Sequence, residues 1–393
     1  MYKNYIKSII DLDLYKLTVS YGYMKMYPDA IGTFQFVDRN HSKVSQKEFV
    51  KICEGLKALE KLALTNNEFD WCVNNIKFIP LYYWEWLRQF RFNFDKIHIW
   101  VDENRELHIE VTDKLYKVTL YEIAVLAIVS EVLCAKTVEV LDWDLIKNNL
   151  LKKLEIAHEH NFKFSEFGTR RRFSFDVQDY IMKCIEHYDI HNTCVGTSNV
   201  YLAYKYNFKP IGTHPHEWFM FHGAQFGYKN ANYLALKAWQ DIYHGDLGIA
   251  LTDTYTTDVF FKNFSLDQSK EFDGTRHDSG DPYVFAQKAI DHYKNYKIDP
   301  LTKTIVFSDG LDFPTAAEIA DWCNGKILRS FGSGTNLTND VGGKACNIVM
   351  KLISCRMNEN QPEYGCIKLS DVPGKHLGNP KEIEVAKYQL NIA

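Results

Sequence analysis

The feature that most constrains the fold is a pattern repeated through the middle of the chain: a short apolar run, a polar loop and a helical pattern. The apolar runs are KFSEF, KPIGT, LGIALT, TIVFS and KILRSF. Repeated strand–loop–helix units predict a parallel sheet, either closed into a barrel or open. Because the polar, glycine-rich loops all follow strands, we expect them to meet at the carboxyl edge of that sheet, where such folds place their sites.

The two ends of the chain show a different pattern. Residues 46–64 carry apolar residues at helical spacing, and residues 97–112 form two β-rich runs around a polar turn, which predicts a hairpin. From about Asn347 the sequence returns to β patterns, so this segment is expected to rejoin the first part of the chain. A length of 393 residues exceeds the usual size of a single core and suits two domains.

Composition and charge exclude several classes of protein. The formal net charge of −4 gives no sign of a general nucleic-acid binder. The most apolar stretch, residues 123–134, contains Ser130 and Glu131 and predicts a buried helix, not a membrane span, and the N-terminus has no apolar core of a signal peptide. Nine cysteines without a CxxC pair favour a reduced, cytoplasmic protein that has neither a disulfide framework nor a structural zinc site.

Two glycine-containing clusters combine charged and hydroxyl side chains. In RHDSGDP (residues 276–282) the carboxylates suit ribose hydroxyls or Mg²⁺ and the arginine suits a phosphate or a carboxylate; the alternative is a solvated loop that caps the next helix. In FGSGTN (residues 331–336) a glycine-rich turn can direct backbone N–H groups at a phosphate, although it is neither a Walker A motif nor GxGxxG. The alternative there is an ordinary strand-to-helix turn.

Two further clusters carry cationic side chains. The three adjacent arginines of FGTRRR (residues 167–172) are not expected to be packing residues and suit diphosphate oxygens, the alternative being a basic surface loop. In HPHEW (residues 214–218) no HExxH pattern indicates zinc, and a histidine beside Glu217 suits a nucleophile toward phosphate. A purely structural histidine is the alternative. No GxSxG elbow indicates a serine hydrolase.

Taken in order, these segments resemble the nicotinate phosphoribosyltransferases, close to the bacterial form of these type II phosphoribosyltransferases. The motifs that carry the resemblance are DLDLYKLT, FGTRRRFS, GTSN, GTHPHEW, ALTDTY, RHDSGDP, FSDGLD, FGSGTNLT and KLSDVPGK. The resemblance implies an α/β fold in which an irregular, TIM-like α/β barrel is joined to an open-faced α/β sandwich formed by both chain ends. The expected parts are residues 1–135 and 346–393 for the sandwich and residues 136–345 for the catalytic barrel.

The resemblance also implies a reaction. Nicotinate and 5-phosphoribosyl 1-diphosphate would give nicotinate mononucleotide and diphosphate, coupled to ATP hydrolysis through a phosphohistidine, on a salvage route to NAD. Mg²⁺ is the implied cofactor and ATP the co-substrate. The implied partners are small-molecule substrates, with neither nucleic acid nor membrane. Relatives build the site across a dimer, with the segment of Tyr15 from the partner chain, so the resemblance leaves a homodimer open.

The resemblance implies catalytic roles for His216, Arg276 and Asp278 and a metal or substrate contact for Asp309. His216 matches the histidine that ATP phosphorylates, and Arg276 matches a position that contacts the carboxylate of the substrate. Asp278 and Asp309 match acidic residues near the ribose and Mg²⁺, directly or indirectly.

The remaining matched positions bind substrate. Phe167 and Tyr15 match the two rings that sandwich the pyridine, and Arg170 matches an arginine that holds diphosphate. The other substrate-binding positions lie in strand-following loops, those that hold the 5′-phosphate among them: Thr197, Ser198, Gly310, Gly332, Gly334 and Thr335.

Ser198 bears on the choice of substrate. Related nicotinamide enzymes carry an aspartate there, which would repel the carboxylate of nicotinate, whereas a serine hydroxyl can donate to it. Pro215 departs from the family, which more often has a small residue before the histidine. The alternatives left open are a nicotinamide- or quinolinate-using relative and a non-catalytic nucleotide-binding regulator on a degenerate barrel.

Overall fold

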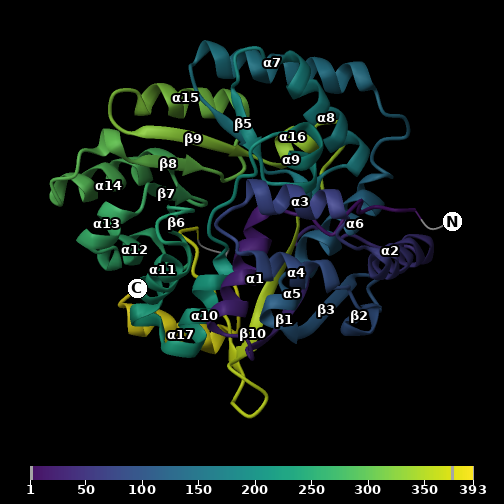
Figure 1. The fold of residues 1–393 in the computed structure, drawn as a ribbon, viewed down its shortest axis with the longest axis horizontal. Coiled ribbons are helices and arrows are strands. Elements are labelled where there is room, and N and C mark those ends of the chain that lie inside the picture. Colours follow the sequence, from purple (N-terminus) through teal and green to yellow (C-terminus); the bar gives the residue numbers. More distant parts are fainter. Residues whose placement is uncertain (1–2, 373–375, 393) are drawn as a thin grey trace.

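The computed structural model describes residues 3–372 and 376–392, and this part of the chain contains one parallel and one antiparallel sheet (Figure 1). The parallel sheet has the order β5-β4-β9-β8-β7-β6. Its strands are β4 (Phe164–Glu166), β5 (Cys194–Thr197), β6 (Ile249–Leu251), β7 (Gly274–His277), β8 (Thr304–Phe307) and β9 (Leu328–Ser333). The predicted parallel sheet of strand–loop–helix units is therefore confirmed.

Aromatic side chains hold the centre of the parallel sheet together. Phe307 and Phe331, on the neighbouring strands β8 and β9, stack with ring centroids 5.6 Å apart, and both are buried. Phe162, just before β4, packs edge-on against Phe331 at 4.9 Å. These rings fill the sheet interior, so the polar residues that follow each strand project at its carboxyl edge.

The segment KPIGT is not the strand that its sequence pattern predicts. It pairs with β5 at one bridge, between Thr197 and Pro210, where Thr197 N donates to the Lys209 carbonyl and Ile211 N donates to the Thr197 carbonyl. A longer ladder is disfavoured because Pro210 lacks the N–H donor that a central strand needs. This irregular segment runs beside the edge strand β5 and leads directly into α10 (His216–Phe226).

The antiparallel sheet joins the two ends of the chain. Its order is β11-β10-β1-β3-β2, formed by β1 (Ile31–Asp38), β2 (Ile97–Val101), β3 (Leu107–Lys114), β10 (Ile348–Arg356) and β11 (Tyr364–Gly365). The predicted hairpin over 97–112 is confirmed as β2 and β3, and the C-terminal return is confirmed by β10 pairing along the full length of β1. The residue bounds of the three expected parts stay predictions.

Helices cover the sheets and bring the N-terminal segment to the site. α6 (Tyr121–Cys134) is buried at every residue, as its apolar sequence predicts. The predicted helix over 46–64 is α2 (Gln46–Ala58), which starts at the capping box of Ser45 and Glu48 and ends in the 3₁₀ turn η1 (Leu59–Lys61). α1 (Leu14–Met26), which the sequence analysis does not predict, lies near the centre of the molecule (Figure 1).

The other helices follow the strands or surround the two sheets. They are α3 (Asn66–Asn75), α4 (Leu81–Gln89), α5 (Leu115–Val118), α7 (Trp143–Glu159), α8 (Phe175–Tyr188), α9 (Val200–Tyr206), α11 (Ala231–Tyr243), α12 (Thr257–Asn263), α13 (Leu266–Glu271), α14 (Pro282–Asn295), α15 (Phe313–Cys323), α16 (Thr335–Thr338) and α17 (Pro380–Leu390). Of the helices that the structure describes, none combines the length and apolar character needed to cross a bilayer. The last three residues of the KLSDVPGK motif, 373–375, lie outside the described residues.

Candidate active site

A cavity of about 650 Å³ opens at the carboxyl edge of the parallel sheet, between that sheet and residues of β1 and β10. Nearly all of the predicted site residues line it: Tyr15, Phe167, Arg170, Ser198, His216, Arg276, Asp278, Asp309, Gly310, Gly332, Gly334 and Thr335. Thr197 is the exception. It is fully buried and its hydroxyl donates to Glu166 Oε2, so it supports the neighbouring Ser198 from beneath the cavity.

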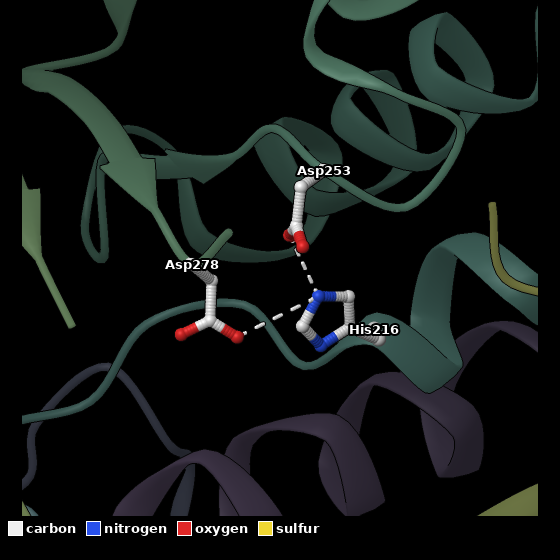
Figure 2. A group of neighbouring side chains, drawn as sticks. All are labelled: His216, Asp253 and Asp278. Atoms are coloured by element: carbon white, nitrogen blue, oxygen red, sulfur yellow. Dashed lines mark hydrogen bonds and ion pairs between the residues drawn. The ribbon is translucent and has the colours of Figure 1, made fainter. Parts of the chain in front are cut away.

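His216 lies at the first turn of α10 and points between two carboxylates (Figure 2). Its Nε2 is 2.8 Å from Asp253 Oδ1 and 3.8 Å from Asp278 Oδ2. Burial lowers the pKa of His216 below its ordinary value, the Lys368 ammonium adds to this, and Asp253 opposes it. A neutral imidazole held by a carboxylate is the arrangement that a nucleophilic histidine needs.

Asp253 connects His216 to two further groups that the sequence analysis did not assign. Its Oδ2 accepts hydrogen bonds from Lys368 Nζ and Ser279 Oγ, each at 2.8 Å, and Lys368 Nζ also lies 2.8 Å from His216 Nε2. Burial alone would raise the pKa of Asp253, but His216 and Lys368 hold it well below the usual range. Asp253 is therefore ionised. Asp253 lies just after β6, as the other site residues lie just after their strands. This position in the sequence is the signal that could have identified Asp253 as a site residue.

Arg276 and Asp278 form a second charged group at the ends of β7 and β8. Arg276 Nη2 pairs with Asp278 Oδ1 at 2.8 Å, while Nε donates to Ser308 Oγ and Nη1 to Thr213 Oγ1, also at 2.8 Å. Burial opposes ionisation of Asp278, yet Arg276 holds its pKa below the ordinary value. The segment is thus not the solvated loop that was the alternative, although Asp281 does cap α14.

The carboxylates beside His216 have the chemistry of a partial metal shell. His216, Asp253 and Asp278 each offer a ligand atom, all within 4.8 Å of one another. Carboxylate oxygens suit Mg²⁺, which usually completes its shell with water and substrate phosphate oxygens. Asp278 therefore fits its predicted place near a metal, while the neighbouring carboxylate in this group is Asp253, not Asp309.

Two aromatic rings, Phe167 and Tyr15, reach the same cavity from distant parts of one chain. Phe167 lies so close to Gly332 that a Cβ there would approach its Cδ2 to 2.4 Å, so only glycine fits. Tyr15 donates to Glu122 Oε1 at 3.3 Å, at the buried cluster where Lys16 pairs with Glu122 and Glu217. The segment of Tyr15 thus enters the site of its own chain.

The three arginines at residues 170–172 have different environments. Arg170 and Arg171 line the cavity, and Arg171 Nε donates to the Ile348 carbonyl at 2.9 Å. Arg172 is fully buried and holds Asp11 with two hydrogen bonds of 2.8 and 3.0 Å. The expectation that none of the three is a packing residue is wrong for Arg172, because a buried carboxylate compensates its charge.

A further basic side chain, Lys351 on β10, lines the cavity near Arg39. Its Nζ is buried and has no hydrogen-bond partner among the described residues. Burial, with the nearby Arg39, Lys368 and Arg170, lowers the pKa of Lys351 to about 6. An orphaned amine in a cluster of cations fits an anionic ligand that would complete its hydrogen bonds.

Comparisons with known proteins cover nearly the whole chain. Residues 10–130 match the model of the nicotinate phosphoribosyltransferase (NAPRTase) N-terminal domain, and residues 162–392 match that of the nicotinate phosphoribosyltransferase (NAPRTase) family. The nicotinate phosphoribosyltransferase of Desulforapulum autotrophicum is 40% identical over 379 residues, covering 96% of this chain and 97% of the relative. That of Methanosarcina acetivorans is 38% identical and covers 98% of each.

Solved structures agree with the sequence comparison. The crystal structure of nicotinate phosphoribosyltransferase from Porphyromonas gingivalis superposes with a TM-score of 0.96 at 44% identity, over 98% of this chain and 100% of the other. The enzyme structure from Vibrio cholerae gives a TM-score of 0.92 at 32% identity, over 99% and 94%. With the cavity and its charged groups in place, the chain belongs to the nicotinate phosphoribosyltransferase family.

Proposed function

We propose that this chain joins nicotinate to 5-phosphoribosyl 1-diphosphate, releasing nicotinate mononucleotide and diphosphate, and that it couples the reaction to ATP hydrolysis through a phosphohistidine at His216. One observation carries the proposal. A single cavity contains His216 with its two neighbouring carboxylates, two aromatic rings and the Lys351 amine, which has no hydrogen-bond partner among the described residues. We also propose that the reaction belongs to a salvage route to NAD, since its product is a pyridine mononucleotide.

The transfer itself requires orientation more than acid–base catalysis. The pyridine nitrogen attacks the anomeric carbon with its own lone pair, and the bond from that carbon to the diphosphate oxygen breaks, the electron pair leaving with diphosphate. Phe167 and Tyr15 hold the plane of the pyridine, and Arg276 and Ser198, which line the same cavity, bind its carboxylate. Arg170 and Lys351 stabilise the departing diphosphate.

The 5′-phosphate and ribose bind at the strand ends. Gly310, Gly334 and Thr335 supply backbone groups for the phosphate, with Gly332 beneath the Phe167 ring, and Asp309 and Asp278 accept from ribose hydroxyls. Mg²⁺ would be held by Asp278 with Asp253 beside it, and by Asp309 directly or through water, and would supply charge neutralisation for the diphosphate. The substrates are small molecules, and neither nucleic acid nor membrane has a part in the proposal.

ATP acts on His216 and not as the source of the transferred group. The imidazole attacks the terminal phosphorus of ATP, the bond to ADP breaks, and Asp253 stabilises the positive charge that forms on the ring. The phosphorylated state binds substrates tightly, and hydrolysis of the phosphohistidine favours product release, a coupled shift of populations.

The reduced interior thiols fit a cytoplasmic setting. A homodimer stays part of the proposal, although Tyr15 reaches the cavity of its own chain and a partner chain is not needed to supply this ring.

One assay tests the reaction and its rivals. The purified chain is incubated with phosphoribosyl diphosphate, Mg²⁺ and one pyridine at a time (nicotinate, nicotinamide or quinolinate), with and without ATP, and nucleotide and diphosphate are quantified. We expect nicotinate mononucleotide with the first pyridine and a stimulation by ATP. Preference for either of the other pyridines contradicts the substrate assignment. Absence of diphosphate release with all three supports a non-catalytic nucleotide-binding protein.

A further inference from the structure

Two cysteines outside the proposed chemistry face each other at the back of the cavity wall. Cys134 ends α6 and Cys346 lies just before β10, and their sulfurs are 3.3 Å apart. A disulfide needs about 2.05 Å between its sulfurs. An approach of about 1.3 Å would therefore join two segments that lie far apart in the sequence.

The surroundings of this pair favour the reactive form of sulfur. Cys134 Sγ accepts hydrogen bonds from the Cys346 thiol and from Asn339 Nδ2, the latter at 3.5 Å. The bond from Cys346 and, more weakly, that from Asn339 lower the pKa of Cys134 although burial opposes them. The thiolate, not the thiol, is the form that attacks disulfides, so Cys134 is suited to the second attack, which resolves a mixed disulfide on Cys346. The contact with Cys134 and burial raise the pKa of Cys346, so its exposure, and not its acidity, makes Cys346 the first sulfur to react.

Access distinguishes this pair from a second one. Cys355 and Cys366 have sulfurs only 3.4 Å apart, but both residues are buried and at most 1% exposed. Cys346 is partly exposed and adjoins Ala345, which lines the main cavity. At nearly equal separation of the sulfurs, only the first pair includes a partly exposed cysteine through which a small oxidant could react.

The reactive pair is connected to the site through the loop between the helix α16 and β10. Asn339, Gly343 and Ala345 of this loop line the cavity, and Asn339 Nδ2 also donates to the Arg171 carbonyl at 2.8 Å. Drawing Cys346 toward α6 moves this wall and removes the thiolate acceptor of Asn339.

We propose that Cys134 and Cys346 are a redox-sensitive modification site, which closes to a reversible disulfide with small disulfides such as oxidised glutathione and thereby impairs ligand binding in the cavity. The Cys346 sulfur, its proton passing to solvent, attacks the oxidant, whose S–S bond breaks to release one glutathione thiolate. The Cys134 thiolate then attacks the Cys346 sulfur and releases the second. The two protons of the pair end on two glutathione molecules, and two electrons pass from protein to oxidant.

The test starts with the fully reduced chain, incubated with oxidised glutathione. Free thiols are counted, the mass is measured and the disulfide-linked peptides are mapped. We expect two of the nine thiols to be lost, the mass to fall by two hydrogen atoms, and the peptides of Cys134 and Cys346 to be linked. Reductant should restore all nine. This readout is independent of any enzymatic activity.

Single variants locate the bond. Cys355→Ser should lose the same two thiols as the unchanged chain, whereas Cys346→Ser should form no internal disulfide. Linkage of Cys355 to Cys366, or retention of all thiols, would overturn the site. Diphosphate binding is then measured by calorimetry on the reduced and oxidised chains. Weaker binding after oxidation, restored by reductant and absent in Cys346→Ser, supports the coupling to the cavity, and unchanged binding contradicts it.

Discussion

Ser198 donates its hydroxyl to Asp13 Oδ1 over 2.7 Å, and both side chains are buried at the edge of the cavity. A hydroxyl has one proton to donate. While Asp13 is ionised, Ser198 therefore cannot also donate to a substrate carboxylate, which was the basis for its predicted role. Burial, the foremost influence, raises the pKa of Asp13 despite hydrogen bonds from Ser198 and Thr169. A protonated Asp13 would donate to Ser198 and release the serine proton for the substrate.

Asp13→Asn is expected to retain or improve affinity for nicotinate, since the amide can donate to Ser198 and carries no negative charge. In the unchanged chain, protonated Asp13 favours nicotinate binding, and the pKa of Asp13 is raised. Nicotinate affinity should therefore fall as the pH rises through the pKa of Asp13. The variant should lose this dependence. Nicotinate KM across pH checks it, with nicotinamide, which has no carboxylate, as the control substrate. A large loss of nicotinate affinity in Asp13→Asn contradicts the proton exchange.

Asp253→Asn is expected to lower ATP-dependent phosphorylation of His216 by roughly 100-fold, as loss of one preorganised electrostatic group commonly does. The amide keeps the shape but neither stabilises a charged imidazole nor balances Lys368, which lies 2.8 Å from both partners. The measurement is acid-labile phosphate incorporated from labelled ATP. His216→Asn should incorporate none, and an exposed histidine variant, His187→Asn, should match the unchanged chain. Equal labelling in Asp253→Asn would remove Asp253 from the phosphoryl step.

The repeated strand–loop pattern predicted the parallel sheet and the edge where the site lies, because hydrophobic runs report burial directly. It missed β7, since GTRH has no hydrophobic residue and is a strand only through its pairing with β6 and β8. It also missed the contacts of Lys368 with His216 and Asp253, which depend on the C-terminal segment returning to the parallel sheet. Pairing between distant residues of this kind leaves no local trace in one sequence.

The arginine triplet shows the same limit at the scale of single residues. Arg170 and Arg172 are two positions apart, yet one lines the cavity and the other is enclosed with Asp11. The 3₁₀ turn η3 (Thr169–Arg171) sends their side chains in different directions. A run of like charges therefore predicts neither exposure nor function until the turn geometry and the position of Asp11 are known.

Asp11→Ala is expected to destabilise the chain by about 3–5 kcal/mol, because it leaves the buried Arg172 guanidinium without its compensating carboxylate. The measurement is the free energy of unfolding from urea titration. Asp241→Ala is the matched control, since its pair with Lys237 is exposed on α11, where solvent screens the two charges, and should change stability little. An equal loss of unfolding free energy in the two variants would show that the buried Asp11–Arg172 pair contributes no more to stability than the exposed pair.

Lys351→Met is expected to weaken diphosphate binding and to remove proton uptake on binding. In the free chain the pKa of Lys351 is lowered to about 6, so this amine is neutral at pH 8. A bound polyanion raises that pKa, and the amine then takes up a proton. Affinity in the unchanged chain should therefore fall as pH rises above about 6.

Calorimetry at pH 8 in buffers of different ionisation enthalpy measures this uptake, expected to approach one proton per site in the unchanged chain and none in Lys351→Met. Lys344→Met controls for loss of a nearby charge, because Lys344 is exposed in the loop before β10. It should leave proton uptake intact and lower affinity only slightly, since an exposed ammonium is screened by solvent. Equal proton uptake in all three chains would place the diphosphate away from Lys351, and the orphaned amine would then require another ligand.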